Sequence, residues 1–113
     1  MNLSVTSEIS TSIGTKVTGA VGYINAHTDQ LMSTGKVPCD LQFWVSLDAS
    51  AKNFDRFIPA ILKQDGTIQS KVGAVTIALT AQEASGPNLP ATIFNKVAAA
   101  LTATYGWAVT VTA

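Results

Sequence analysis

The residues of this chain that could do chemistry are few and far apart in sequence. His27 is the only histidine and Cys39 the only cysteine among 113 residues. His27 could serve as a general base or a metal ligand, but Asp29 lies two positions on and would not orient it from the same helix face. A nucleophilic thiol needs a nearby base and a lowered pKa, whereas Asp40 beside Cys39 would raise that pKa. We therefore expect a surface or interface histidine and a small buried cysteine.

The carboxylates form no recognisable site. They are Glu8, Asp29, Asp40, Asp48, Asp55, Asp65 and Glu83. Asp48 and Asp55 flank a polar segment, where they could hold a cation or simply be surface charge, and Asp65 before Gly66 is typical of a turn. The glycine spacings match no phosphate-binding loop, and one histidine with one cysteine cannot complete a zinc site within a protomer. We expect no enzymatic activity, no cofactor and no metal ion.

Composition excludes several classes of protein. Seven Lys and Arg balance seven Asp and Glu, and charged residues make up 12% of the chain, about half the usual fraction. With no basic excess to neutralise phosphates, duplex nucleic acid is not an expected partner. A lone cysteine cannot build a disulfide framework, and the N-terminus lacks the features of a secretory signal. No stretch approaches the apolar length of a membrane span. Because the sequence shows no internal repeat, linker or low-complexity tract, we predict a single domain over residues 1–113.

Hydrophobic spacing predicts a long N-terminal helix. Residues of one face recur every three or four positions, with Thr28 filling a gap among the apolar residues Ile9, Ile13, Val17, Val21, Ile24 and Leu31. This spacing predicts a helix over about residues 6–33. Three glycines and many Ser and Thr in the segment lower its helix propensity, and near-alternation over residues 3–9 leaves a strand open at its start.

Alternation predicts the next elements. Residues 40–48 predict a half-buried strand, with Leu41, Phe43, Val45 and Leu47 on one face and Trp44 on the other. The Asp65–Gly66 pair predicts a hairpin, whose first arm Pro59 restricts to an edge strand or irregular structure. A short helix over residues 54–62 is the alternative for that arm. Residues 75–80 predict a strand, with Gly73 marking a bulge.

The C-terminal third predicts a helix followed by a strand. Residues 90–105 carry a helical apolar stripe, with Asn88 or a neighbour at its start and Gly106 at its end. Residues 107–112 alternate and place Trp107 in the core. Together the elements predict a two-layer α+β domain, with about four mainly antiparallel strands and two helices packed on one face.

The aromatic residues and the low charge indicate association. Trp44 would emerge on the second sheet face, and Phe54 and Phe57 lie beside a polar loop, so these three are candidate interface residues unless that face is covered within the monomer. The exposed faces must consist largely of Ser, Thr, Ala, Gln and Asn, and zero net charge does not oppose self-association. The sequence therefore favours a protein that works in an assembly.

In its overall character the chain resembles small virion proteins of tailed phages, of the tail-terminator and head–tail joining type. The SEISTSIG…TDQL segment, as a helix, and the terminal WAVTVTA strand are the matching pieces. The resemblance implies a homo-oligomer that contacts other virion structural proteins, located in the virion after assembly in the host cytoplasm, or otherwise cytoplasmic. A small ligand- or peptide-binding module or accessory subunit, using the sheet face around Trp44, is the alternative function.

Overall fold

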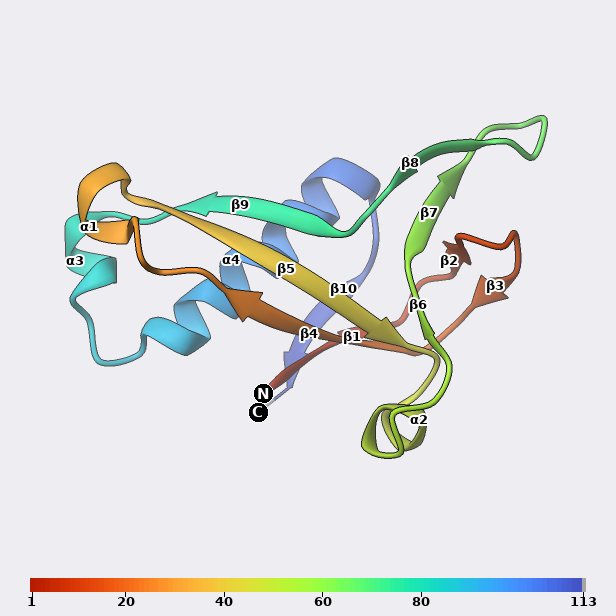
Figure 1. Cartoon of the computed structure of the whole chain (residues 1–113), viewed down its shortest axis with the longest axis horizontal. Helices are drawn as coiled ribbons and strands as arrows, with labels where there is room; N and C mark the ends of the chain where they lie inside the picture. The colour runs from red at the N-terminus through yellow and green to blue at the C-terminus, as the bar shows by residue number, and fades with distance from the viewer. Residues whose placement is uncertain (113) are drawn as a thin grey trace.

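A six-stranded antiparallel sheet forms the body of the molecule (Figure 1). The structure is a computed structural model that describes residues 1–112. In spatial order the strands are β10 (Val109–Thr112), β1 (Asn2–Val5), β4 (Ala20–Ala26), β5 (Lys36–Trp44) and β6 (Arg56–Phe57), and β9 (Ala74–Ala78) also pairs with β5. The first and last strands of the chain therefore lie side by side, and β10 forms one edge of the sheet.

One face of this sheet is buried beneath a long helix, α4 (Leu89–Tyr105). Along most of β5, buried and exposed residues alternate, as the period of a strand requires. The buried side chains of β5 that point toward α4 are Val37, Cys39, Leu41 and Phe43. They share one hydrophobic core with the buried side chains of α4, which are Ile93, Val97, Ala98 and Leu101. Within residues 1–112 the opposite face of the sheet is covered by a helix only where α2 (Leu47–Ala51) lies against β4 and β5.

The C-terminal third of the chain folds as predicted. α4 has Pro90 in its first turn and ends at Gly106, although the Asn88 side chain makes no cap hydrogen bond within residues 1–112. Trp107 is 7% exposed and belongs to the core. The predicted strand before this helix is also present as β9, with Ile77 buried on its inner face.

The helix predicted over residues 6–33 is wrong. The segment forms β2 (Ile9–Thr11), β3 (Lys16–Val17) and β4, and its helical part is the single turn α1 (Leu31–Thr34). Ile13, predicted on the apolar stripe, is 83% exposed.

Turn geometry explains this difference. Gly14 and Gly19 adopt φ values of 88° and 79°, a left-handed conformation that the interior of an α-helix does not allow. Both lie where one strand turns into the next. Val21 and Ile24, predicted on one helix face, instead point to opposite faces of β4 because side chains alternate along a strand.

A second sheet packs beside the first, with the order β3-β2-β7-β8. β7 (Pro59–Leu62) and β8 (Ile68–Lys71) form the hairpin predicted at Asp65–Gly66, so the helical alternative for residues 54–62 is wrong. Pro59 begins β7, where a strand tolerates the missing N–H. β7 is nevertheless an inner strand and not the predicted edge, because it pairs with both β2 and β8.

The strand predicted over residues 40–48 starts and ends earlier. β5 stops at Trp44, and Ser46 then caps the short helix α2 (Leu47–Ala51) by accepting a hydrogen bond from the Ala49 N–H at 3.1 Å. Leu47, predicted on the buried face, is 60% exposed. This cap begins a helix at the point where the alternating sequence pattern predicted that the strand would continue.

The α+β class and the antiparallel pairing are confirmed, but the architecture is larger than predicted. Residues 1–112 form a six-stranded and a four-stranded sheet with four helices, where we expected about four strands and two helices. α1 and α3 (Ala81–Ala84) are single turns, so α4 alone provides a full helix layer in this range. None of the helices described is long and apolar enough to cross a membrane.

Candidate functional site

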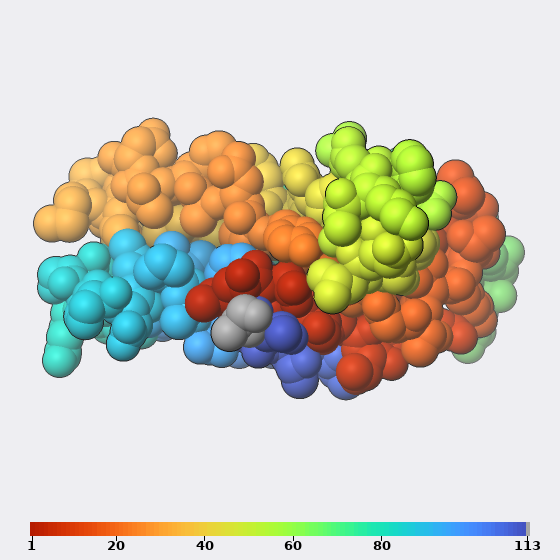
Figure 2. Space-filling view, turned by 90° about the horizontal axis from the view of Figure 1, so that it is seen from below, coloured from red at the N-terminus to blue at the C-terminus, as the bar shows by residue number. Residues whose placement is uncertain are grey.

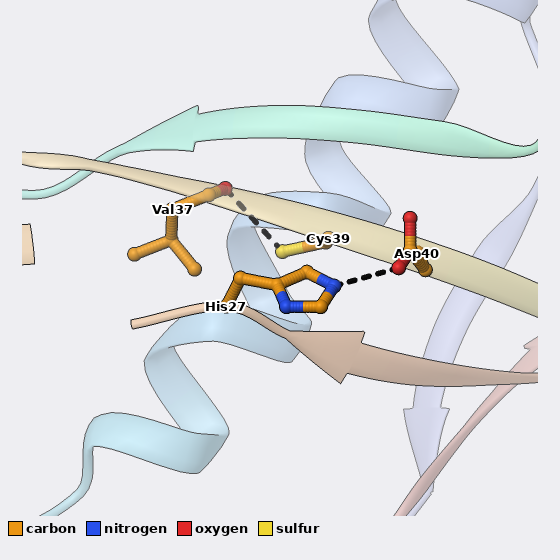
Figure 3. A network of polar contacts seen from close by, with 4 residues as sticks. All are labelled: His27, Val37, Cys39 and Asp40. Atoms are coloured by element: carbon orange, nitrogen blue, oxygen red, sulfur yellow. Dashed lines mark hydrogen bonds and ion pairs between the residues drawn. The ribbon is translucent and has the colours of Figure 1, made fainter. Parts of the chain in front are cut away.

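β4 and β5 bring His27 and Asp40 together on the face of the sheet opposite α4 (Figure 3). Asn25 faces Asp40 in the strand register, and the N–H of His27 donates to the Pro38 carbonyl at 2.8 Å. His27 Nε2 and Asp40 Oδ2 are 2.6 Å apart. This hydrogen bond, and then the charge of Asp40, raise the pKa of His27 above its usual value. The carboxylate that orients His27 is therefore Asp40, whereas sequence reasoning considered only Asp29.

Cys39 lies on the opposite face of β5, in the core. Its side chain is fully buried, and Sγ donates a weak hydrogen bond to the Val37 carbonyl at 3.5 Å. Burial, and then the negative charge of Asp40, raise the pKa of this thiol, which keeps it protonated and unreactive. Cys39 and His27 thus do not form a nucleophile and its base. The predictions of a buried cysteine and a surface histidine are confirmed.

The other carboxylates that sequence analysis singled out serve local structure. Asp48 pairs with Lys52, with Nζ and Oδ2 at 3.2 Å. Glu83 joins α3 to α4 through Lys96, again at 3.2 Å. In the part of the chain that the structure describes, no three His, Cys, Asp or Glu residues are grouped closely enough to hold a metal ion.

The three aromatic residues predicted at an interface lie in different environments. Trp44 is 7% exposed, because Tyr23 meets its indole edge-on at 5.4 Å between ring centres and α2 lies over both. The Tyr23 hydroxyl shares a hydrogen bond of 3.2 Å with Ser50 of α2. Phe57 is half-buried against the core, and Phe54 is 61% exposed. The second sheet face is therefore covered at Trp44, which removes the free indole that motivated a ligand-binding function there.

Beyond Trp44 this second face is exposed, and we call it the open face. It consists of the outward side chains of β1, β4, β5, β9 and β10. Asn25, Gln42, Thr76 and Thr110 are typical of it, because hydroxyl, amide and methyl groups dominate. The only residues with fixed charge in these five strands are Lys36 and Asp40. The open face is thus a nearly uncharged surface, as the composition predicted for the exposed faces.

The two long edge strands of the same sheet are also uncharged. β9 reads AVTIA and β10 reads VTVT. The edge strands of the second sheet differ, because β3 carries Lys16 and β8 carries Lys71. A charged residue on an edge strand is a common protection against pairing with another chain. The VTVT pattern was visible in the sequence, but only the structure shows that β10 is an edge.

A small apolar depression of about 290 Å³ lies where the end of β4 meets the start of α4. Ile24, Leu89, Ile93 and Phe94 are among its walls, and Thr28 is the one residue with a side-chain hydroxyl there. Orienting a small-molecule substrate takes several convergent polar groups. The depression therefore favours an apolar contact over catalysis.

Comparison with known proteins places the chain in no family: no protein-family model, no curated protein and no solved structure matches it. The functional argument therefore rests on the open face and the edge strands of this molecule.

Proposed function

We propose that this chain is a non-enzymatic structural subunit that works through contacts with copies of itself and with other structural proteins. The distribution of charge carries the proposal. The open face and its two long edges contain only Lys36, Asp40 and the titratable His27 among hydroxyl, amide and methyl groups. Covering such groups costs less desolvation energy than covering ions, and a net charge of zero does not drive copies apart.

Most of the remaining charge lies elsewhere, although Arg56 stands in β6, the short third edge strand of the six-stranded sheet. On the second sheet Lys16 pairs with Glu8 at 3.4 Å, and Lys63 and Asp65 stand in the exposed β7–β8 turn. α2 carries its own Asp48–Lys52 pair. Charged groups thus protect the second sheet and the loops, while the two long edges of the six-stranded sheet, β9 and β10, are left uncharged and suited to contact.

Within this class we propose a tailed-phage virion protein, acting in the tail, the neck or as a capsid accessory, and assembled in the host cytoplasm. The N-terminal helix that contributed to the resemblance is replaced by strands. What supports the proposal is the low charge of the whole chain, its open face, and the WAVTVTA segment, of which Val109–Thr112 form the sheet edge β10.

Light scattering of the purified chain tests the assembly role. We expect masses above 11.8 kDa that rise over a range of about 10–200 μM, since a small interface gives modest affinity. Because the contacts are uncharged, the mass should change little between low and high salt. A constant 11.8 kDa over the whole range contradicts the proposal.

Quantitative mass spectrometry of purified phage particles tests the virion role separately. A virion subunit must be present at a fixed copy number in every preparation. Particles that lose the chain on further purification, while keeping their infectivity, would show that it is not a virion component.

A further inference from the structure

The backbone of β10 has one side paired and one side open. The Thr6 N–H donates to the Ala108 carbonyl at 2.9 Å, and the register continues as Val5 with Val109 and Ser4 with Thr110. In an antiparallel ladder only every second residue exchanges hydrogen bonds with a given neighbour. Ala108 and Thr110 therefore face β1, whereas the N–H and C=O groups of Val109 and Val111 point to the open edge.

The side chains of Val109 and Val111 are also incompletely covered. Both are partly buried against the core, and they border a groove of about 540 Å³ between β10 and α4. The helix side of this groove consists of Asn95, Ala98, Ala99, Thr102 and Ala103. All of its lining residues are uncharged, and those of the helix are small. The groove thus extends the apolar layer of the domain past the edge of the sheet.

We propose that this edge and groove bind the β10 strand of a second copy of the chain, in an antiparallel pair that joins the two six-stranded sheets. The inference deepens the proposed function and rests on it, because it names the surface through which the subunit associates. In Figure 2, β10 in blue lies beside β1 in red.

The sequence of β10 makes the pair self-complementary. Suppose that Val109 faces Val111 of the second copy. Val109 and Val111 of both copies then point their free N–H and C=O groups at one another, so each of these groups gains a hydrogen-bond partner. The two-fold axis then passes between Thr110 and its copy. In this register the valines of both copies lie on the side of α4, above the two grooves, and the small residues of α4 allow the two helices to approach.

A second copy suits this site better than a charged partner. Neither the groove nor β10 carries an ionisable side chain, so nothing there selects for charge on the occupant. The second copy brings an equally uncharged strand and an equally neutral molecule. One four-residue strand and one helix face are less than the roughly 800 Å² that each partner buries in a typical stable complex. We therefore expect an affinity in the micromolar range.

Disulfide trapping tests the pair. Residues on the axis form a non-hydrogen-bonded pair with Cα atoms about 4.5 Å apart, within the range of a disulfide. Under mild oxidation Thr110→Cys should give a cross-linked dimer. The matched control is Thr76→Cys, which replaces a threonine that is also exposed, on the other uncharged edge, β9, and this variant should stay monomeric on the gel. The native Cys39 is fully buried and contributes no background.

A second variant keeps the test independent of disulfide chemistry. Thr110→Lys places two positive charges across the axis and should weaken dimerisation about fivefold at low salt, with a smaller effect at high salt. Thr76→Lys should leave the dimer unchanged.

Three outcomes overturn the inference. The first is self-association of the native chain without a Thr110→Cys cross-link. The second is cross-linking only in the Thr76→Cys/Thr110→Cys double variant, which would show a head-to-tail ring of β9 on β10. Both leave the assembly role standing. The third is a native chain that stays monomeric at every concentration, in which case the proposed function fails as well.

Discussion

Replacing Gly22 with alanine should destabilise the fold, although Gly22 has an ordinary strand conformation. Gly22 faces Phe43 across β4 and β5 on the inner side of the sheet. A Cβ atom at this position would lie 2.7 Å from Phe43 Cε1 and 3.0 Å from Cδ1. The ring cannot move aside easily, because Phe43 is fully buried between Phe57 and Trp107, at 6.3 and 6.5 Å between ring centres.

Two opposing effects set the size of the change. Forcing an extra methyl group into a packed core costs about 1–3 kcal/mol. Alanine also restricts the unfolded chain, which returns about 0.4–1 kcal/mol. We expect Gly22→Ala to lose about 1–2 kcal/mol of unfolding free energy, or roughly 4–10 °C in Tm for a domain of this size.

Urea denaturation followed by tryptophan fluorescence measures this loss. Gly73→Ala is the matched control, since a Cβ there meets no described atom within 4 Å, and its stability should stay within about 0.5 kcal/mol of the native chain. In a Phe43→Leu background the Gly22→Ala penalty should shrink, because the ring atoms that clash are gone. A Gly22→Ala variant as stable as the native chain, or a penalty unchanged by Phe43→Leu, would refute the packing argument.

Three further changes test the core, a cap and the exposed ion pair. Leu101→Ala empties a fully buried position under the sheet and should cost about 2–5 kcal/mol in urea denaturation; a loss below 1 kcal/mol would contradict its core role. Thr80→Ala breaks the α3 capping box and should cost about 0.5–2 kcal/mol. The hydrogen bond from the Thr80 backbone N–H is the main cause of the lowered pKa of Glu83. Glu83 should therefore contribute fully to stability above its pKa in the unfolded chain, and this contribution should fade as pH falls through its pKa in the folded chain. A pH series of unfolding curves would show this dependence. Asp40→Asn should return the pKa of His27 to about 6.5 in an NMR titration. In the native chain the contribution of the His27–Asp40 pair to stability should be full below the pKa of His27 in the unfolded chain and lost as pH rises through its raised pKa in the folded chain. If His27 titrates at the same pH in the native chain and in Asp40→Asn, the pair is refuted.

Elements with strong local signals could be predicted from the sequence. The alanine run and Gly106 define α4, and the Asp65–Gly66 pair defines the turn of the β7–β8 hairpin. The segments predicted to be strands from their alternation form β9 and β10. In these segments propensity, capping and periodicity all favour the same structure, and tertiary packing is compatible with that local preference.

The N-terminal segment shows where periodicity misleads. Three short strands joined by tight turns placed their apolar residues three or four positions apart, which imitates one face of a helix. The residue types indicated otherwise, because the segment is rich in Ser, Thr and Gly, all poor helix formers. Gly14 and Gly19 are turn signals, and they were better predictors of this segment than the apolar spacing.

The site features depended on long-range register that no local pattern contains. His27 and Asp40 meet because α1 joins β4 to β5 in one register, and a shift by one residue would turn Asp40 to the core. Trp44 is covered because α2 folds back over the sheet. The Ser46 cap with Asp48 in the first helical turn was a readable signal for that helix.

Amide hydrogen exchange at the β10 edge, measured by NMR at low and high protein concentration, tests the central claim of association through this strand most directly. The Thr110 N–H, which faces β1, should be protected at both concentrations. The amides of Val109 and Val111 should exchange quickly in the dilute protein and become protected as its concentration rises through the micromolar range. Fast exchange of both valine amides at every concentration, beside a protected Thr110, would contradict the account.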